Sequence, residues 1–269
     1  MNYLETSTSE SRPVAVKGSI VSFGMYDVSI VVPIHNEARL IKNLVNDLCE
    51  AFHEHHTTPT YQLVLCENGS TDDSRALLAE AAEDHEGITV ISLPEASYGA
   101  AMKAGILHAS GDSIVVFNAD LWSPQFVIES LRLLNSGSDV VIGSKCLNAG
   151  DDRRPFLRRL ITRSFNRLLM LFFGFKGTDT HGIKAIRRRA LLPVVNACVT
   201  SREIFDTEFV LRASQQGLSI SEIGVTVTDT RPPRMSLLRR ITPTLVDLFK
   251  LWFALRAPEV TLRAETTPT

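Results

Sequence analysis

Residues 113–120, SIVVFNAD, join an apolar run to an oxygen-rich end. A continuous apolar run is typical of a parallel strand that is buried on both faces of a sheet. Ligands gather at the carboxyl ends of such strands, and here that end carries Asn118, Ala119 and Asp120. Side chains two residues apart along a strand point the same way, so Asn118 and Asp120 are expected to face one spot. The stretch therefore predicts a parallel α/β sheet with two oxygen donors at its ligand-binding edge.

The triplet at 118–120 has two interpretations. Hard oxygen ligands that face one spot suit Mg²⁺ or Mn²⁺ bridging a nucleotide diphosphate. The alternative is an ordinary turn at the end of the strand, because Asn and Asp favour turns. Short acidic motifs are common, so the triplet alone does not decide between the two.

The composition is that of an ordinary globular protein. The chain has 269 residues, of which 44% are hydrophobic and 22% charged, and a net charge of −2. This charge balance gives no reason to expect a nucleic-acid partner. The four cysteines are far apart and show no CxxC pairing, which predicts reduced, structural thiols in a cytoplasmic protein without zinc. Residues 1–24 are expected to be a flexible tail with no signal peptide, and no stretch reaches the roughly 20 apolar residues of a membrane span.

Strand and helix patterns alternate along the first half of the chain. This alternation predicts a mostly parallel sheet with right-handed crossovers, sandwiched by helices. The helix that follows residue 70 is expected to open with N-cap chemistry and first-turn acids. Strands are predicted at 26–33, 62–66, 88–93, 113–117 and 139–143, and helices at 37–52, from 70, and at 99–108.

Several short motifs occur in an order that resembles family 2 GT-A glycosyltransferases, and in particular the dolichyl- and polyprenyl-phosphate mannose or glucose synthases. No single motif is specific, but their number, order and spacing are. The motifs are VVPIHNE at 31–37, ENGSTDDS at 67–74, NAD at 118–120, VIGSK at 141–145, RRLITR at 158–163, DTHGIKA at 179–185 and FDTE at 205–208.

The resemblance implies a donor site at the ends of the first strands. It implies a GT-A catalytic domain over 25–236, in which Glu37 and Asn68, with Glu67, line a base and ribose pocket. Lys103 could reach a phosphate or be an ordinary exposed lysine, and Glu37 could simply be a first-turn helix acid. The expected donor-binding residues are Pro33, His35, Glu37, Glu67, Asn68, Lys103, Asn118, Ala119 and Asp120.

The metal motif departs from the family pattern at two positions. Asn118 stands where the family has its first Asp, and Trp122 stands where the mannose synthases often have a Gln. An amide oxygen can ligate Mg²⁺ or Mn²⁺ but contributes no charge, so binding should depend on Asp120, the donor diphosphate and water. The departures also leave open a catalytically silent, nucleotide-sugar-binding subunit.

The second half of the chain carries the residues expected at the acceptor. Arginine forks match phosphate oxygens, and the resemblance implies that Lys145, Arg158 and Arg231 contact phosphate. A phosphate acceptor is already an anionic nucleophile at pH 7 and needs little base catalysis. A neutral hydroxyl acceptor would need a base, and Asp179, Asp206 or Glu208 could serve unless they only cap helices. His181 is expected to be a turn residue.

Two segments combine apolar stripes with basic residues. They are residues 153–173 and the C-terminal helix expected within 237–269. Such helices can lie in a membrane interface. They can equally pack on the sheet or on another copy or a membrane subunit.

Together these features predict a transferase at the cytoplasmic membrane face, and the family resemblance implies a single inverting displacement. It would move a hexose from a nucleotide-diphosphate sugar, with GDP-mannose favoured over UDP-sugars, to a polyprenyl-type lipid phosphate, with Mg²⁺ or Mn²⁺. The lack of a C-terminal membrane domain in the sequence resembles the short mannose synthases. A family 2 enzyme with another lipid or a small-molecule acceptor is the alternative within enzymes.

Overall fold

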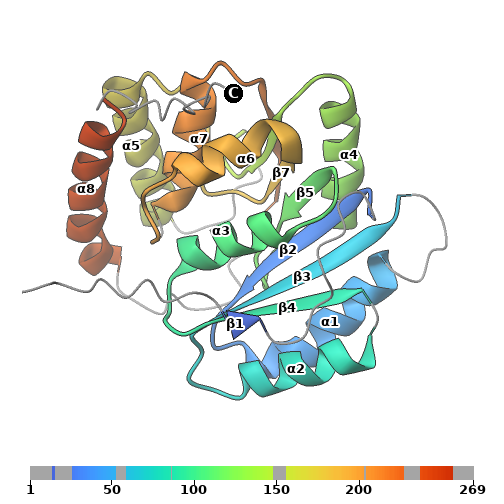
Figure 1. The fold of residues 1–269 in the computed structure, drawn as a ribbon. Coiled ribbons are helices and arrows are strands. Elements are labelled where there is room, and N and C mark those ends of the chain that lie inside the picture. The colour runs from blue at the N-terminus through green and yellow to red at the C-terminus, as the bar shows by residue number, and fades with distance from the viewer. Residues whose placement is uncertain are drawn as a thin grey trace, which may run out of the picture.

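The computed structural model describes residues 14–15, 26–52, 59–85, 87–147, 156–202, 204–226 and 237–256. Of the predicted flexible tail, 1–24, the structure describes only Val14–Ala15, which form a short strand instead. The rest of that tail, Arg153, Arg154 and the predicted phosphate contact Arg231 lie outside the described residues. Of Arg158 only the backbone is described. In this part of the chain, helices pack against both faces of one sheet (Figure 1).

The sheet has eight strands in the order β1-β4-β3-β2-β5-β7-β6-β8. The pairs β4–β3, β3–β2, β2–β5 and β6–β8 are parallel, which confirms the mostly parallel sheet. The strand β7 was not predicted, and it is antiparallel to both of its neighbours. The strands are β1 (Val14–Ala15), β2 (Val28–Ile34), β3 (Tyr61–Asn68), β4 (Ile88–Leu93), β5 (Ser113–Val116), β6 (Val140–Ser144), β7 (Lys184–Arg187) and β8 (Ile220–Gly224).

Eight helices of the described chain cover the sheet. They are α1 (Ala38–Phe52), α2 (Ser74–Asp84), α3 (Tyr98–His108), α4 (Pro124–Asn135), α5 (Phe156–Phe173), α6 (Arg188–Ala197), α7 (Phe205–Gln215) and α8 (Leu237–Ala254). Figure 1 shows α1 and α2 on one face and α3 on the other. No helix in the described ranges is both long and apolar enough to cross a membrane.

Two apolar clusters form the core, one on each face of the sheet. Side-chain alternation divides β2 between them, because Val31 belongs to one cluster and Ile30 and Val32 to the other. Helices α1, α2 and α4 contribute to the second cluster, and α3, α5, α6, α7 and α8 to the first. Cys49, Cys66 and Cys198 are buried, and burial raises the pKa of the Cys66 and Cys198 thiols to about 12, as expected of structural cysteines.

One edge of the sheet collects the segments that the motifs occupy. The strands β2, β3, β5 and β6 end at this edge, and the antiparallel β7 begins there. Pro33 is buried in β2 just beyond the last residue paired with β5, Val31. The Val31 carbonyl accepts from Phe117 N, so the proline nitrogen, two residues on, faces the side that β5 has left. The edge can therefore open between β2 and β5.

Candidate active site

The loops that follow β2 and β3 are joined to each other by side-chain hydrogen bonds. Asn36 has a left-handed φ of 54°, its N–H donates to Ser70 Oγ at 3.0 Å, and its Oδ1 accepts from Thr71 N at 2.8 Å. Asn tolerates this conformation better than most residues. The Asn-Glu of the first motif thus has a conformational reason, which is to lock the two motif loops together.

Asp72 holds the starts of two helices. Its carboxylate accepts from Ala38 N at 3.1 Å and from Ser74 N at 3.0 Å, and these hydrogen bonds help to lower the pKa of the Asp72 carboxyl. The helix α2 begins at Ser74 and has no acid in its first turn, and Asp73 makes no side-chain cap bond. The expected first-turn acids were therefore wrong, because Asp72 lies before the helix and is shared with α1.

Glu67 does not line a pocket, contrary to prediction. Its side chain is fully buried, lies 2.9 Å from the Arg75 guanidinium and accepts from Ser70 N. Arg75 also donates to Leu93 O at 3.3 Å. Burying a carboxylate is costly unless it is paired and hydrogen-bonded. Glu67 meets this condition and holds the second motif loop in place through Ser70.

His35 and Asn68 remain at the open edge. The Asn68 carbonyl accepts from His35 Nδ1 at 2.7 Å, which makes Nε2 the acceptor for the Asn36 amide 3.2 Å away. Asn68 Oδ1 accepts from Ser97 N at 2.6 Å, before α3. Glu37 is partly buried, and its N–H donates to Ser74 Oγ at 2.9 Å. These residues lie together in the candidate donor half of the site.

Lys103 is hydrogen-bonded within the protein, and its predicted phosphate contact stays a prediction. Its Nζ donates to Cys198 O at 2.9 Å and lies 3.5 Å from Asn196 O. These carbonyls end α6, where free carbonyl groups and the helix dipole favour a cation. Lys103 therefore joins α3 to α6.

The triplet at 118–120 is a tight turn rather than a continued strand. Asn118 and Leu121 exchange both backbone hydrogen bonds, at 3.2 and 3.1 Å. Ala119 and Asp120 are therefore the corner residues, and the strand alternation that was expected to align Asn118 with Asp120 does not apply. Trp122 packs with Phe52 in the core, with ring centroids 6.4 Å apart.

The turn presents a carboxylate that a metal ion could use. Asp120 is exposed and makes no hydrogen bond or ion pair with the residues that the structure describes. Within the described ranges, no group of three His, Cys, Asp or Glu side chains could hold a metal by itself. The donor set of Asp120, with the Asn118 amide nearby in sequence, fits a cation that shares its ligands with a bound diphosphate.

The candidate acceptor half lies at the ends of β6 and β8 and at the start of β7. Asp179 is buried, and its carboxylate accepts from His181 N at 2.9 Å and Lys145 N at 3.4 Å. Lys145 is partly exposed, and its Nζ has no hydrogen-bond partner in the described chain. Glu222 on β8 accepts from Thr178 N at 2.7 Å and so fixes this loop. Nothing in the local sequence distinguishes Glu222 from a solvated strand residue.

Two further carboxylates beside this loop are paired with cations. Asp206 is buried 2.9 Å from Lys184 Nζ, and Tyr98 Oη donates to it at 3.4 Å. Glu208 accepts from Thr200 N at 2.7 Å and Arg212 Nε at 2.8 Å. The three carboxylates predicted as alternative bases are therefore all buried and hydrogen-bonded or ion-paired within the protein. They are Asp179, Asp206 and Glu208.

The helix α5 borders the acceptor half. Asn166 donates to Thr178 O, and the Phe165 ring meets His181 edge-on at 5.5 Å. Two turns earlier, Arg159 has a buried Nε without a hydrogen-bond partner among the residues that the structure describes. An unpaired buried donor is costly, so Arg159 is a candidate for an anion contact, next to the predicted Arg158.

Glu208 gives the stability a defined pH dependence. Burial raises the pKa of its carboxyl, but hydrogen bonds from Thr200, Val199 and Arg212 outweigh burial and hold the pKa below its ordinary 4.5. The stabilisation is present above that value and is lost as pH falls through the folded-state pKa. We expect wild type to unfold at higher denaturant concentration than Glu208→Gln at pH 7, with the gap narrowing below about pH 4. A constant gap from pH 7 to pH 3 would contradict this.

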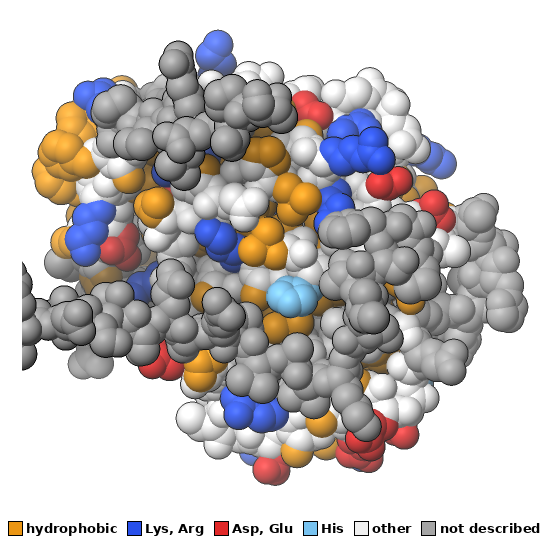
Figure 2. All heavy atoms as spheres, in the orientation of Figure 1, with side chains coloured by type: hydrophobic (Ala, Val, Ile, Leu, Met, Phe, Trp, Pro, Cys, Tyr) orange, Lys and Arg blue, Asp and Glu red, His pale blue; other side chains and the backbone are white. Residues whose placement is uncertain are grey.

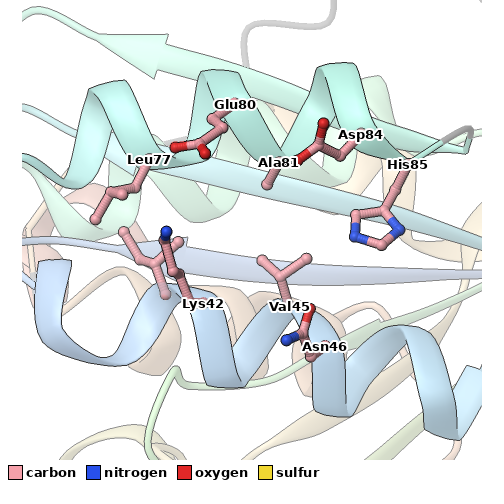
Figure 3. A pocket seen from close by; sticks show the side chains of 9 residues that line it. Lys42, Val45, Asn46, Leu77, Glu80, Ala81, Asp84 and His85 are labelled. Carbon is pink, nitrogen blue, oxygen red and sulfur yellow. The ribbon is translucent and has the colours of Figure 1, made fainter.

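A small groove lies between α1 and α2, away from this edge. It holds about 140 Å³, and Figure 3 shows Lys42, Val45 and Asn46 facing Leu77, Glu80 and Asp84 across it. Ligand pockets usually measure roughly 300–1,000 Å³. The groove is thus too small for a nucleotide sugar, and the motif residues point to the open sheet edge instead.

Comparisons with known proteins identify the family of the chain. The model of glycosyl transferase family 2 matches residues 29–194, and the chain belongs to this family. Glycosyltransferase AglD of Haloferax volcanii is 27% identical over 94% of the chain and 41% of its own length. Dolichyl-phosphate beta-glucosyltransferase ALG5D of Trichomonas vaginalis is 25% identical over 83% of the chain and 72% of its own length.

Two further comparisons concern a bacterial relative and the fold. Undecaprenyl-phosphate 4-deoxy-4-formamido-L-arabinose transferase of an Enterobacter strain is 31% identical over 62% of the chain and 50% of its own length. The chain thus spans half or less of two of these three relatives. Glucosyl-3-phosphoglycerate synthase from Mycobacterium tuberculosis, solved with Mn²⁺ and UDP, matches with a TM-score of 0.60 at 19% identity, covering 86% of this chain and 80% of that one. This likeness confirms the expected GT-A fold.

Proposed function

We propose that the protein transfers a hexose from a nucleotide-diphosphate sugar to a polyprenyl-type lipid phosphate. One observation carries the choice of acceptor. The three predicted carboxylate bases beside the acceptor half, Asp179, Asp206 and Glu208, are buried and hydrogen-bonded or ion-paired. The carboxylates that could serve a hydroxyl acceptor as its base are therefore not free, whereas a phosphate monoester already carries the charge of a nucleophile at pH 7.

The available cations fit the same acceptor. Lys145 Nζ and Arg159 Nε have no hydrogen-bond partners in the described chain. Positive groups at this half would hold the acceptor phosphate close to the donor diphosphate and so offset their repulsion. Arg158 and Arg231 remain predicted phosphate contacts from the resemblance. The names of the relatives, which transfer sugars to dolichyl or undecaprenyl phosphate, support this acceptor class.

The donor would bind at the ends of β2, β3 and β5. Asp120, with Asn118, would hold Mg²⁺ or Mn²⁺, and that ion would neutralise charge on the departing diphosphate. His35, Glu37 and Asn68 would contact the nucleoside. GDP-mannose is the donor expected from the sequence resemblance, and UDP-glucose is the competing donor suggested by the glucosyl relative and the UDP-bound neighbours.

Sugar transfer into the organic phase tests the proposal. The protein is incubated with radiolabelled GDP-mannose or UDP-glucose, Mn²⁺ and a polyprenyl phosphate, and the lipid product is extracted. We expect label in the organic phase with one donor and no label when EDTA replaces Mn²⁺. If neither donor labels the lipid but thermal shift shows metal-dependent nucleotide binding, the acceptor assignment is wrong. If no nucleotide shifts the melting temperature, the donor-site assignment is wrong as well.

The helices α5 and α8 would place the enzyme on the membrane. Ten of the fourteen exposed large hydrophobic side chains in the described residues lie on them, six on α5 and four on α8. Each helix also packs against the core, α5 through Leu169 and α8 through Leu248 and Leu251. The exposed hydrophobic side chains therefore form a second apolar face, in addition to the face that packs on the core. In Figure 2, hydrophobic side chains gather at the upper left, where Figure 1 places α8, with Lys and Arg side chains beside them.

The aromatic and basic residues of α8 favour a lipid surface as the occupant. The Phe253 ring contacts those of Phe249 and Trp252, and the Arg256 guanidinium lies 3.8 Å from the Trp252 ring centroid. Trp and basic residues together are typical of a membrane interface. An interfacial position would also bring a lipid-anchored phosphate to the acceptor half, which α5 borders.

Removing two of these rings should weaken membrane binding. Phe249 and Phe253 are 63% and 54% exposed, and burying a Phe side chain is worth about 1.5–3 kcal/mol. We expect Phe249→Ser with Phe253→Ser to lower binding to anionic vesicles at least about tenfold in a flotation assay. Ile128→Ser, a 46% exposed residue on α4, is the matched control and should bind as wild type does. If the double variant binds vesicles as wild type does, but wild type forms a dimer and the variant does not, the exposed face binds a second copy of the chain instead.

A further inference from the structure

His181 is held at the acceptor edge by contacts on several sides. His181 lies in the loop before β7. The strand β7 pairs with β5, and β5 leads into the 118–121 turn. The backbone N–H of His181 donates to Asp179 Oδ1 at 2.9 Å. The ring Nδ1 lies 3.0 Å from Thr180 Oγ1, and the Phe165 ring of α5 contacts the imidazole. The residue as a whole is partly buried. The imidazole therefore has a defined orientation at the acceptor edge, which a turn residue does not require.

The ring is hydrogen-bonded through Nδ1 to a hydroxyl rather than to a carbonyl. Thr180 Oγ1 is also 3.0 Å from the buried Thr207 Oγ1, so the two hydroxyls can reverse their donor and acceptor roles together. His35 differs, because its Nδ1 faces the Asn68 carbonyl and must carry the proton. His181 Nε2 makes no hydrogen bond to any described residue. Nε2 can thus present either a proton or a lone pair.

Four charged groups from different elements surround the ring. Burial lowers the pKa of His181, Lys184 on β7 and Lys145 after β6 lower it further, and Asp206 on α7 and Asp179 in the loop raise it. The net effect lowers the pKa of His181, so the imidazole is neutral at pH 7 in the free protein. A dianion placed beside the ring would reverse this balance, since an opposite charge favours the protonated form.

We propose that His181 binds the phosphate of the acceptor through Nε2, beside Lys145, and takes up the proton of its monoanionic form. This inference rests on the proposed function. The proton passes from the phosphate oxygen to Nε2 and leaves a dianionic monoester. A dianion oxygen then forms the bond to the anomeric carbon, while the bond to the nucleoside diphosphate breaks and its electron pair leaves with the diphosphate. The transfer consumes no proton, so the imidazolium returns its proton to solvent.

Acceptor kinetics of His181→Gln test this role. The substrates are farnesyl phosphate as a short polyprenyl phosphate and the labelled nucleotide sugar, at pH values from about 5.5 to 8. We expect the acceptor KM to rise about tenfold, as for a lost hydrogen bond to a charged group, while the donor KM stays unchanged. The pH profile of kcat/KM for the acceptor should lose one ionisation that wild type shows.

A matched histidine controls for the loss of an imidazole. His108 ends α3 at the opposite edge of the sheet, with its Nδ1 bonded to Ala104 O at 2.8 Å, and His108→Gln should behave as wild type. Unchanged acceptor KM and pH profile in His181→Gln would overturn the proposal. A parallel rise in both KM values with a lower melting temperature would also overturn it, because the role would then be structural. If wild type labels no lipid phosphate at all, the proposed function fails first and this inference with it.

Discussion

Replacing Asp120 by alanine is expected to lower kcat/KM for sugar transfer by at least about a hundredfold, because charge on the departing diphosphate would lose its metal counter-ion. The structure leaves this carboxylate exposed at the corner of the 118–121 turn, with no bond to described residues. The substitution removes no structural contact of the described chain. The fold and melting temperature should therefore be unchanged, and the loss should appear in turnover and in Mn²⁺-dependent nucleotide binding.

Asn118→Asp tests the same turn in the opposite direction. A second carboxylate adds charge to the donor set, so we expect activity to be kept and half-saturation to occur at a lower Mn²⁺ concentration. Glu83→Ala, which removes an exposed acid on α2, is the matched control and should match wild type in both assays. Full activity of Asp120→Ala would refute the metal assignment, and metal-independent activity of all variants would refute metal use.

Replacing Lys184 by methionine is expected to lower the free energy of unfolding by about 3–5 kcal/mol. Lys184 and Asp206 are 1% and 3% exposed at their side chains, and Nζ also donates to Gly182 O at 2.7 Å. Removing the ammonium leaves the Asp206 carboxylate buried without its partner, which costs more than the pair itself contributes. Denaturant unfolding at pH 7 measures the difference, and Lys42→Met on the surface of α1 should stay within about 0.5 kcal/mol of wild type.

A double variant separates the charge from the shape of this pair. Lys184→Met with Asp206→Leu replaces the buried ion pair by apolar groups, and such replacements are often neutral or stabilising. We expect the double variant to recover most of the stability that the single variant loses, which gives a large coupling energy. Two additive losses would show that the two side chains act independently.

The alternation of strands and helices was readable because the core imposes it. The strands β2, β3 and β5 are apolar on both faces, and the structure buries both faces. The strand β7 escaped prediction because it is short, contains the charged Lys184 and runs antiparallel, so it lacks the apolar run of its neighbours. A lysine is accepted there only because α7 brings Asp206 to within 2.9 Å.

The candidate site was predicted as a set of motifs, but several roles within it were not. Glu67 and Lys103 carry charges that suggested ligand contacts, and in the structure they bind Arg75 and the end of α6. A charge that serves the fold and a charge that serves a ligand have the same sequence signature. Only the positions of their partners distinguish the two.

The sequence by itself determined the family, the parallel α/β sheet and the edge at which the site lies, because apolar periodicity and motif order are local properties of the chain. The tertiary structure alone decided which charges are free. It turned 118–120 into a corner that presents Asp120, buried Asp179, Asp206 and Glu208 in bonds, and left Lys145 and His181 at the open edge. The reason is physical: whether a polar group is free depends on its desolvation and on partners that lie far away along the chain.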